Sequence, residues 1–286
     1  MKRGVFLIVG VLGLLLLPGD TAHANSLKIA PLEYRATLAE GEVKKGFVDI
    51  SNPEYKTISV ELDVLGFRQT DDNGTIEFFE DEQIAAGIQL DFDEVTLQPR
   101  EAYRVYFLLD GSKLPSGDVF GAIFARTVPD SPGSAEQAVR VGTLVMLENK
   151  TPGARDAEIT DLSVGFLQFG SGISGSYTVK NTADSSQATG FFPEVNLAVT
   201  PLRLEQSATS SLVFAGRERS NEFQIDTERF GLYRVTASFG DSSQSRWVLI
   251  LNQWALVTLL AVGVLGYLVY RFVWSRRSKL KISRRK

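Results

Sequence analysis

Five acidic residues surround an Asn-Gly pair in the stretch FRQTDDNGTIEFFED, residues 67 to 81. Acids at this density are suited to bind calcium through oxygen atoms, or to supply the two carboxylates of a glycosidase. The spacing does not match the EF-hand loop. An Asn-Gly pair between strands favours a type I′ turn, in which both residues have positive φ. We therefore expect a hairpin turn at Asp71, Asp72, Asn73 and Gly74, with a calcium ion bound to residues 71 to 81 as the open alternative.

A pair of catalytic carboxylates is the enzymatic interpretation of the same region. Neighbouring positions on a strand or turn point in opposing directions, and nothing in the sequence places a matched acid opposite them. Charge runs of this kind are typical of a solvated face, so we expect no catalytic residue. The acids considered are Glu77, Glu80, Asp81 and Glu82.

The residue types present exclude several other chemistries. The chain of 286 residues has no cysteine, and its one histidine is His23. Disulfides, thiolate zinc sites and cysteine nucleophiles are therefore unavailable. A mature chain without His23 also lacks the means for a Ser-His-Asp triad or a histidine-ligated metal. We expect no cofactor and no metal centre.

The N-terminus has the three-part pattern of a secretory signal peptide, which we assign to residues 1–24. A basic start is followed by an apolar run from Val5 to Leu17, a Pro-Gly break and the small-residue site Ala22-His23-Ala24. We expect cleavage after Ala24, which would remove His23. An uncleaved anchor is the alternative, but the apolar run is short for a membrane span.

The C-terminus has the pattern of a membrane anchor. Between Arg246 and Arg271 the chain carries no charge, and at ~1.5 Å of rise per residue this stretch covers the ~30 Å core of a bilayer. We predict a single transmembrane helix over residues 247–274 and a basic cytoplasmic tail over residues 275–286. The expected contacts with membrane lipid are Trp254, Trp274, Arg271, Arg276 and Arg277.

The charge is distributed unevenly between the exported part and the tail. Without the signal (two basic residues, one acidic) and without the eight cations from Arg271 onward, 20 basic and 33 acidic residues remain, a net charge of about −13. Such an acidic surface makes nucleic acid an improbable partner.

Short strands are the repeated pattern between residues 25 and 246. The segment TISVELDVLGF alternates, with Ile58, Val60, Leu62 and Val64 on one face. Strands at this spacing, separated by turn residues, are typical of β-sandwiches. A polar Pro-Gly stretch at residues 149–156 separates two strand series. We predict an all-β fold with two tandem immunoglobulin-like sandwiches, residues 25–150 and 151–246, followed by the single transmembrane helix.

Aromatic residues near the first hairpin are candidate ligand contacts, because aromatic rings stack on sugar faces. The alternative for any one phenylalanine is a place in the core. In the second strand series, Phe191-Phe192-Pro193 is either an exposed patch for a partner or the covered end of a strand, and we favour the covered end. The candidate contacts are Tyr55, Phe67, Phe78 and Phe79.

Three segments follow one another in the first strand series: GFVDISNPEYKTISVELDV, TDDNGTIEF and VTLQPREAYRVYFLLDGSKLPSGDVFGAIFA. Together they resemble the first domain of bacterial WxL-interacting proteins, which is itself similar to the pilus-chaperone sandwiches. VKNTAD and VFAGRERSNEFQIDTERFGLYRVTASF resemble the second extracellular domain of that family. The resemblance implies a surface protein whose first domain binds peptidoglycan and whose second domain binds other proteins. The chain has no WxL sequence itself, so a WxL-domain protein would be its partner.

Together, these patterns predict a membrane-anchored bacterial cell-surface binding protein, with its sandwiches outside the cell and its tail in the cytoplasm. Its expected partner is peptidoglycan or a cell-surface protein, and it is not expected to be an enzyme. An extracellular scaffold or a chaperone-like subunit of a membrane complex is the first alternative. A cell-wall glycosidase with paired carboxylates is a weaker one.

Overall fold

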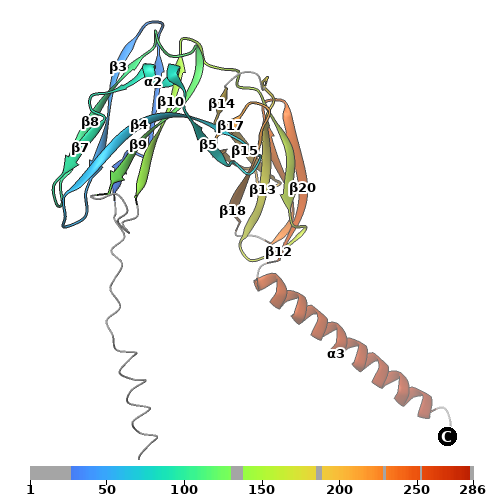
Figure 1. Ribbon diagram of the computed structural model, residues 1–286. Helices are drawn as coiled ribbons and strands as arrows, with labels where there is room; N and C mark the ends of the chain where they lie inside the picture. Colours follow the sequence, from blue (N-terminus) through green and yellow to red (C-terminus); the bar gives the residue numbers. More distant parts are fainter. Residues whose placement is uncertain (1–26, 130–137, 185–188, 228–229, 252, 284–286) are drawn as a thin grey trace, which may run out of the picture.

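The computed structural model describes residues 27–129, 138–184, 189–227, 230–251 and 253–283, and the predicted signal peptide lies outside them. The described chain forms two β-sandwiches followed by one long helix (Figure 1). The elements are β1 (Lys28–Ala30), β2 (Glu33–Leu38), β3 (Val43–Ser51), β4 (Ile58–Gln69), β5 (Ile76–Phe79), α2 (Glu82–Gly87), β6 (Ile88–Leu90), β7 (Glu94–Leu97), β8 (Ala102–Asp110), β9 (Gly117–Val128), β10 (Arg140–Asn149), β11 (Ala157–Val164), β12 (Leu167–Phe169), β13 (Gly172–Asn181), β14 (Gly190–Phe191), β15 (Glu194–Thr200), β16 (Leu204–Thr209), β17 (Val213–Phe214), β18 (Glu218–Asp226), β19 (Gly231–Phe239), β20 (Ser242–Leu251) and α3 (Gln253–Ser283).

The first sandwich packs a sheet in the order β1-β3-β8-β6 against a larger sheet in the order β2-β10-β9-β4-β5, with β7 paired to β4. The alternation predicted for residues 58–64 matches the start of β4, where Ile58, Val60 and Leu62 are buried in the core. Val64 packs at the edge of that core and is half-buried. The strand β10 runs antiparallel to β9 but parallel to β2.

The second sandwich packs a sheet in the order β11-β13-β18 against one in the order β12-β20-β19-β15-β16, and β14 pairs with β17. Its separate core includes Leu162, Tyr177, Leu197, Val235 and Ile250. Since β10 ends at Asn149 and β11 begins at Ala157, residues 150–156 connect the sandwiches. The all-β, two-sandwich fold predicted from strand periodicity is what the described residues show.

The turn after β4 is a hairpin, but the predicted type I′ turn is wrong. Gln69 pairs with Ile76, so the loop has more than the two residues of a type I′ turn. Gly74 has positive φ, +85°, whereas Asn73 does not. The Gly74 amide donates to the Asp71 carbonyl at 3.3 Å, and the Asp71 carboxylate accepts from both the amide and the hydroxyl of Thr75. This side-chain bonding of Asp71 favours a wider loop.

A short helix, α2, was not predicted from the strand pattern. Asp81 is its N-cap and accepts from the amides of Gln83 and Ile84, both at 2.9 Å. Ile84 is buried in the first core. This capped helix has only six residues, so it is too short for hydrophobic periodicity to reveal it.

The predicted helix boundary at residue 247 is also corrected. Residues 247–251 belong to β20, in which Val248 and Ile250 are buried and Trp247 is exposed. This alternation is that of a half-buried strand. The helix α3 begins at Gln253. Within the part of the chain that the structure describes, no helix reaches both the length and the apolar character that a membrane crossing requires.

Candidate functional site

A buried carboxylate, Asp118 of β9, joins the first sandwich to the connector and the second sandwich. Its side chain is 2 % exposed, and both of its oxygens accept hydrogen bonds from Arg155 of the connector, at 2.7 and 2.8 Å. Thr189 and the amide of Gly190 donate to Oδ2 at 2.7 and 3.1 Å. The amide of Gly153 donates to Oδ1 at 3.2 Å. Asp118 therefore holds three separate segments together.

The ionisation of Asp118 follows from these contacts. Burial alone would raise the pKa of the Asp118 carboxyl, because it disfavours the charged form. Hydrogen bonds from Arg155, Thr189, Gly153 and Gly190 outweigh burial, and the pKa lies below its ordinary value. Asp118 is therefore an anion at neutral pH, and Arg155 neutralises it while also bonding Glu148 at 2.8 Å.

An aromatic cluster lies beside this carboxylate, between the two sandwiches. Phe67 of β4, Phe120 of β9 and Phe214 of β17 are all buried and form a core of their own with Ala122 and Met146. The ring centroids of Phe120 and Phe214 lie 4.4 Å apart, and those of Phe67 and Phe214 lie 6.1 Å apart. Aromatic pairs at these separations stabilise an interface beyond the area that they bury.

The acidic hairpin is the third interdomain contact. The Asp72 carboxylate accepts from the amide of Glu218 at 3.2 Å, and the Asn73 carbonyl accepts from Arg219 at 3.0 Å. A Cβ at Gly74 would lie 0.6 Å from the Arg219 guanidinium. The loop tip thus packs closely against the start of β18. Docking between domains therefore accounts for Asp72 and Gly74, whereas Asp71 bonds Thr75 within the loop.

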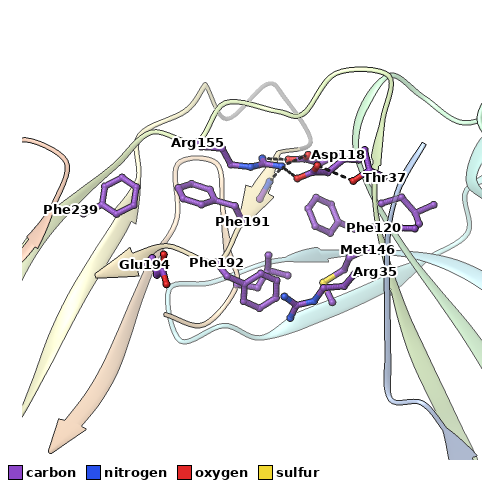
Figure 2. A pocket seen from close by; sticks show the side chains of 15 residues that line it. Arg35, Thr37, Asp118, Phe120, Met146, Arg155, Phe191, Phe192, Glu194 and Phe239 are labelled. Carbon is purple, nitrogen blue, oxygen red and sulfur yellow. Dashed lines mark hydrogen bonds and ion pairs between the residues drawn. The ribbon is translucent and has the colours of Figure 1, made fainter. Parts of the chain in front are cut away.

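A groove of about 710 Å³ opens between the sandwiches along this contact (Figure 2). One wall comes from β2, β9 and β10 of the first sandwich, and the other from the segment of β14 to β15 and from β19. The guanidinium of Arg35 lies 3.8 Å from the ring centre of Phe192, and the rings of Phe191 and Phe239 lie 6.0 Å apart. The groove is mainly apolar, with charged groups at its margin: Arg35, Glu148, Arg155 and Glu194.

The strand β2 lies at the edge of its sheet and lines the groove through Arg35, Ala36 and Thr37. In the described residues β2 is the last strand of its sheet and pairs with β10. The amides of Leu144 and Lys150 donate to the carbonyls of Leu32 and Leu38. The backbone N–H and C=O groups of the even-numbered residues of β2 therefore face β10. In a regular ladder the intervening residues, Glu33, Arg35 and Thr37, then face away. The Thr37 carbonyl also accepts from the Lys44 ammonium at 3.3 Å.

The structure brings Phe67 and Phe78 together, with ring centroids 6.2 Å apart, but it does not gather all four predicted aromatic contacts. Phe67 is 2 % exposed, so its predicted role as a sugar platform is corrected to an interdomain core residue. Phe78 is 39 % exposed and its ring packs edge-on against Phe124. Phe79 is half-buried and lies under Arg68. Tyr55 precedes β4, roughly 40 Å from the hairpin by the length of this 12-residue strand.

Four of the five acids of the opening stretch have structural partners: Asp71, Asp72, Glu77 and Asp81. Glu77 forms an ion pair with Arg68 at 2.8 Å, and Asp81 caps α2. A hydrogen bond from the Thr75 amide is the main cause that lowers the pKa of Asp71. Across the described ranges, no group of three or more acidic or histidine side chains is arranged to hold a metal ion. The calcium alternative gains no support from this arrangement.

The predicted membrane contacts all lie within the bounds of α3. Trp274 is 65 % exposed and its ring lies 5.8 Å from that of Tyr270, and Arg271 is also exposed. The side chains of Trp254, Arg276 and Arg277 lie outside the described residues.

Sequence reasoning missed the residues that form the groove's polar margin. Arg35, Asp118 and Arg155 stand far apart in the chain, the last two being 37 positions apart, and none belongs to a recognisable motif. Phe191 and Phe192 were singled out, with a covered strand end favoured over an exposed patch. Both are half-buried and line the groove, so each interpretation holds in part.

Comparisons with known proteins describe the fold only. No protein-family model matches the chain, and no curated protein matches it. Among solved structures, it is similar to the class 5 fimbriae chaperone CfaA, with a TM-score of 0.41 and 9 % identity over 79 % of this chain and 100 % of that one. It is also similar to the E. coli chaperone DraB, with a TM-score of 0.35 and 13 % identity over 80 % of this chain and 98 % of that one. The human CEP192 PapD-like domain 7 is similar to part of it, with a TM-score of 0.34 and 14 % identity over 48 % of this chain and 93 % of that one.

Proposed function

We propose that this protein is a non-catalytic scaffold or chaperone-like binding protein that holds an extended segment of a protein partner in its interdomain groove. The observation that carries the proposal is the open edge of β2 beside an aromatic wall. The odd-numbered residues of β2 direct backbone groups away from β10, and Phe191 and Phe192 line the same groove. A free sheet edge pairs with extended peptides, and neighbouring pockets select their side chains.

The fixed relation between the two walls supports the same proposal. Asp118, the aromatic cluster and the hairpin tip join the sandwiches at three places. A groove whose walls are already ordered loses less conformational entropy when a partner binds. Of the acids considered as catalytic, Glu77 pairs with Arg68 and Asp81 caps α2, which favours a binding role over glycoside hydrolysis.

The cellular location is part of the proposal. The signal-like residues 1–24 and the apolar run before the basic tail support an exported protein held in the cell membrane by its C-terminal segment. This run includes Ala255, Leu256, Leu259 and Val273, whose side chains the structure does not describe. A cell-surface protein, such as the WxL-domain protein that the sequence resemblance implies, is then the partner class.

Peptidoglycan is the second candidate partner. The rings of Phe191, Phe192 and Phe239 in the groove are the observation that favours it, because sugars stack on aromatic faces. Unlike an extended protein segment, peptidoglycan would not have to pair with the backbone edge of β2.

A proline substitution tests the proposal, because proline removes a backbone donor yet is tolerated on an edge strand. Thr37→Pro deletes an outward-facing N–H of β2, and Thr37→Val, which keeps that N–H, is the matched control. After solubilisation of membranes in mild detergent, we expect Thr37→Pro to bind its protein partner about ten-fold more weakly, in keeping with a lost hydrogen bond and an unsatisfied acceptor. Recovery of equal amounts of the protein partner with both variants would contradict strand pairing. Equal retention of both on purified sacculi would favour peptidoglycan.

A further inference from the structure

The outer face of one sheet in the second sandwich changes from polar to apolar along its strands. Residues directly opposite each other in an antiparallel pair lie on the same face. On the outer face of β19 and β20, the small polar residues at one end give way to tryptophan and leucine at the other. In order, these pairs are Ser238 with Ser243, Thr236 with Ser245, Arg234 with Trp247, and Leu232 with Leu249.

The short strand β12 extends the apolar end of this face. Leu167 pairs with Leu249, and Phe169 pairs with Leu251. Phe169 is 65 % exposed and Trp247 is 54 % exposed. A soluble domain seldom leaves large apolar side chains gathered at its surface unless they bind something. We call this set the end patch: Phe166, Leu167, Phe169, Phe230, Leu232 and Trp247.

The end patch lies where the chain leaves the second sandwich. β20 ends at Leu251 and α3 begins at Gln253, so the connection spans at most about 7 Å. Figure 1 shows β12 at the end of the sandwich from which the chain passes into α3. Whatever surrounds the start of α3 is therefore within reach of the end patch.

The exposed apolar side chains of α3 point in every direction around its axis. Positions 264, 265, 267, 268, 269 and 270 are all large and apolar, and all are exposed. At 3.6 residues per turn, such a run leaves no polar face. A groove on a protein partner covers one face of a helix, whereas a bilayer covers all of them.

We propose that the end patch lies in the interfacial layer of the bilayer that α3 enters, so that the second sandwich rests on the membrane surface. Tryptophan and other aromatic residues favour this layer. Arg234, which pairs with Trp247 and bonds the Ser245 hydroxyl at 2.8 Å, stands at the polar margin of the patch, where anionic lipid head groups attract cations. This inference rests on the membrane attachment proposed above.

Tryptophan fluorescence of the full chain in lipid vesicles tests it. The chain has three tryptophans, and Trp254→Phe with Trp274→Phe leaves Trp247 as the reporter of the end patch. Trp247→Phe with Trp254→Phe leaves Trp274 as the reporter of α3. Vesicles contain phosphatidylcholine and phosphatidylglycerol with brominated acyl chains, which quench tryptophan on contact. We expect quenching of both reporters.

The other outcomes separate the two proposals. Quenching of Trp274 but not of Trp247 would overturn the end-patch inference and leave membrane attachment standing. Quenching of neither would contradict both. Quenching of Trp247 alone would support the end patch and contradict insertion of α3.

A substitution in the patch shows whether the contact is specific. Leu232→Ser, combined with the Trp247 reporter, removes an apolar contact from the patch, and we expect lipid quenching of Trp247 to fall by roughly half or more. Ser238→Ala lies on the same face of β19 at its polar end and is expected to leave the quenching unchanged. Equal quenching in both variants would contradict a role for the patch.

Discussion

Arg155 donates hydrogen bonds from both terminal nitrogens to the carboxylate of Asp118, at 2.7 and 2.8 Å, across the boundary between the two sandwiches. On the surface of the first sandwich, Asp49 also accepts two hydrogen bonds from one guanidinium, from Nε and one terminal nitrogen of Arg104, at 2.7 and 2.8 Å. The two pairs differ in burial. The Asp118 side chain is 2 % exposed and that of Asp49 is 40 % exposed, so they form a natural comparison.

The buried pair should contribute far more stability than the exposed one. Asp118→Asn removes the charge that Arg155 neutralises and is expected to lower the unfolding free energy by about 2–3 kcal/mol. Asp49→Asn, the matched control, should lower it by less than about 1 kcal/mol. Urea unfolding of the full chain in detergent micelles at neutral pH measures both. Equal losses would contradict the interdomain role of Asp118.

Acid should weaken the same contact. The folded pKa of Asp118 lies below its ordinary value, so its contribution is present above the unfolded pKa of about 3.9 and is lost as the pH falls through the lower, folded value. The difference in stability between the wild-type protein and Asp118→Asn should therefore shrink as the pH falls below about 4. Urea titrations at a series of pH values test this, and a difference that stayed constant into strong acid would oppose it.

The hairpin tip can be tested with two glycines. Gly74 and Gly41 both have positive φ, but a Cβ at Gly74 meets Arg219, whereas a Cβ at Gly41 meets nothing within 4 Å. Both alanine variants carry a backbone penalty of roughly 1 kcal/mol. Only Gly74→Ala should also detach the hairpin and speed hydrogen exchange at the Glu218 amide, which bonds Asp72. Similar exchange in the two variants would show that the hairpin does not dock there.

The aromatic cluster should couple the unfolding of the two sandwiches. Phe214→Ala removes the ring that contacts both Phe67 and Phe120, and a loss of about 3 kcal/mol or more is expected from the cavity. Calorimetry should then resolve two transitions where the wild-type protein shows one. Phe230→Ala, at a position 60 % exposed, should leave the single transition intact. A single transition in Phe214→Ala would contradict coupling through the cluster.

The sequence predicted the strands better than it predicted the site, and the reason is physical. Alternation along residues 58–62 is a local property, and it correctly identified the buried face of β4. The burial of Phe67 depends on Phe214, which belongs to the other sandwich, and no local pattern reports that contact. Asp118 and Arg155 likewise become partners only when the sandwiches dock. The acidic hairpin drew attention for its charge, but its role follows from the backbone of β18.

The boundary of α3 shows a second limit. Apolar residues from 247 onward suggested one continuous helix, because hydropathy does not distinguish a strand end from a helix start. The pairing of β20 with β19 and β12 assigns residues 247–251 to the sheet. Period-two burial at Val248 and Ile250 was present in the sequence but was hidden by the leucines that flank them.

Photo-crosslinking from inside the groove tests directly whether it holds an extended segment of a protein partner. A benzophenone amino acid replaces Phe192, which lines the groove, or Phe92, which is exposed at a distant loop. After irradiation of intact cells, we predict one crosslinked protein from position 192, attached through a single extended peptide and lost when Thr37→Pro is added. The absence of an adduct at position 192, or the same adduct from position 92, would contradict the claim.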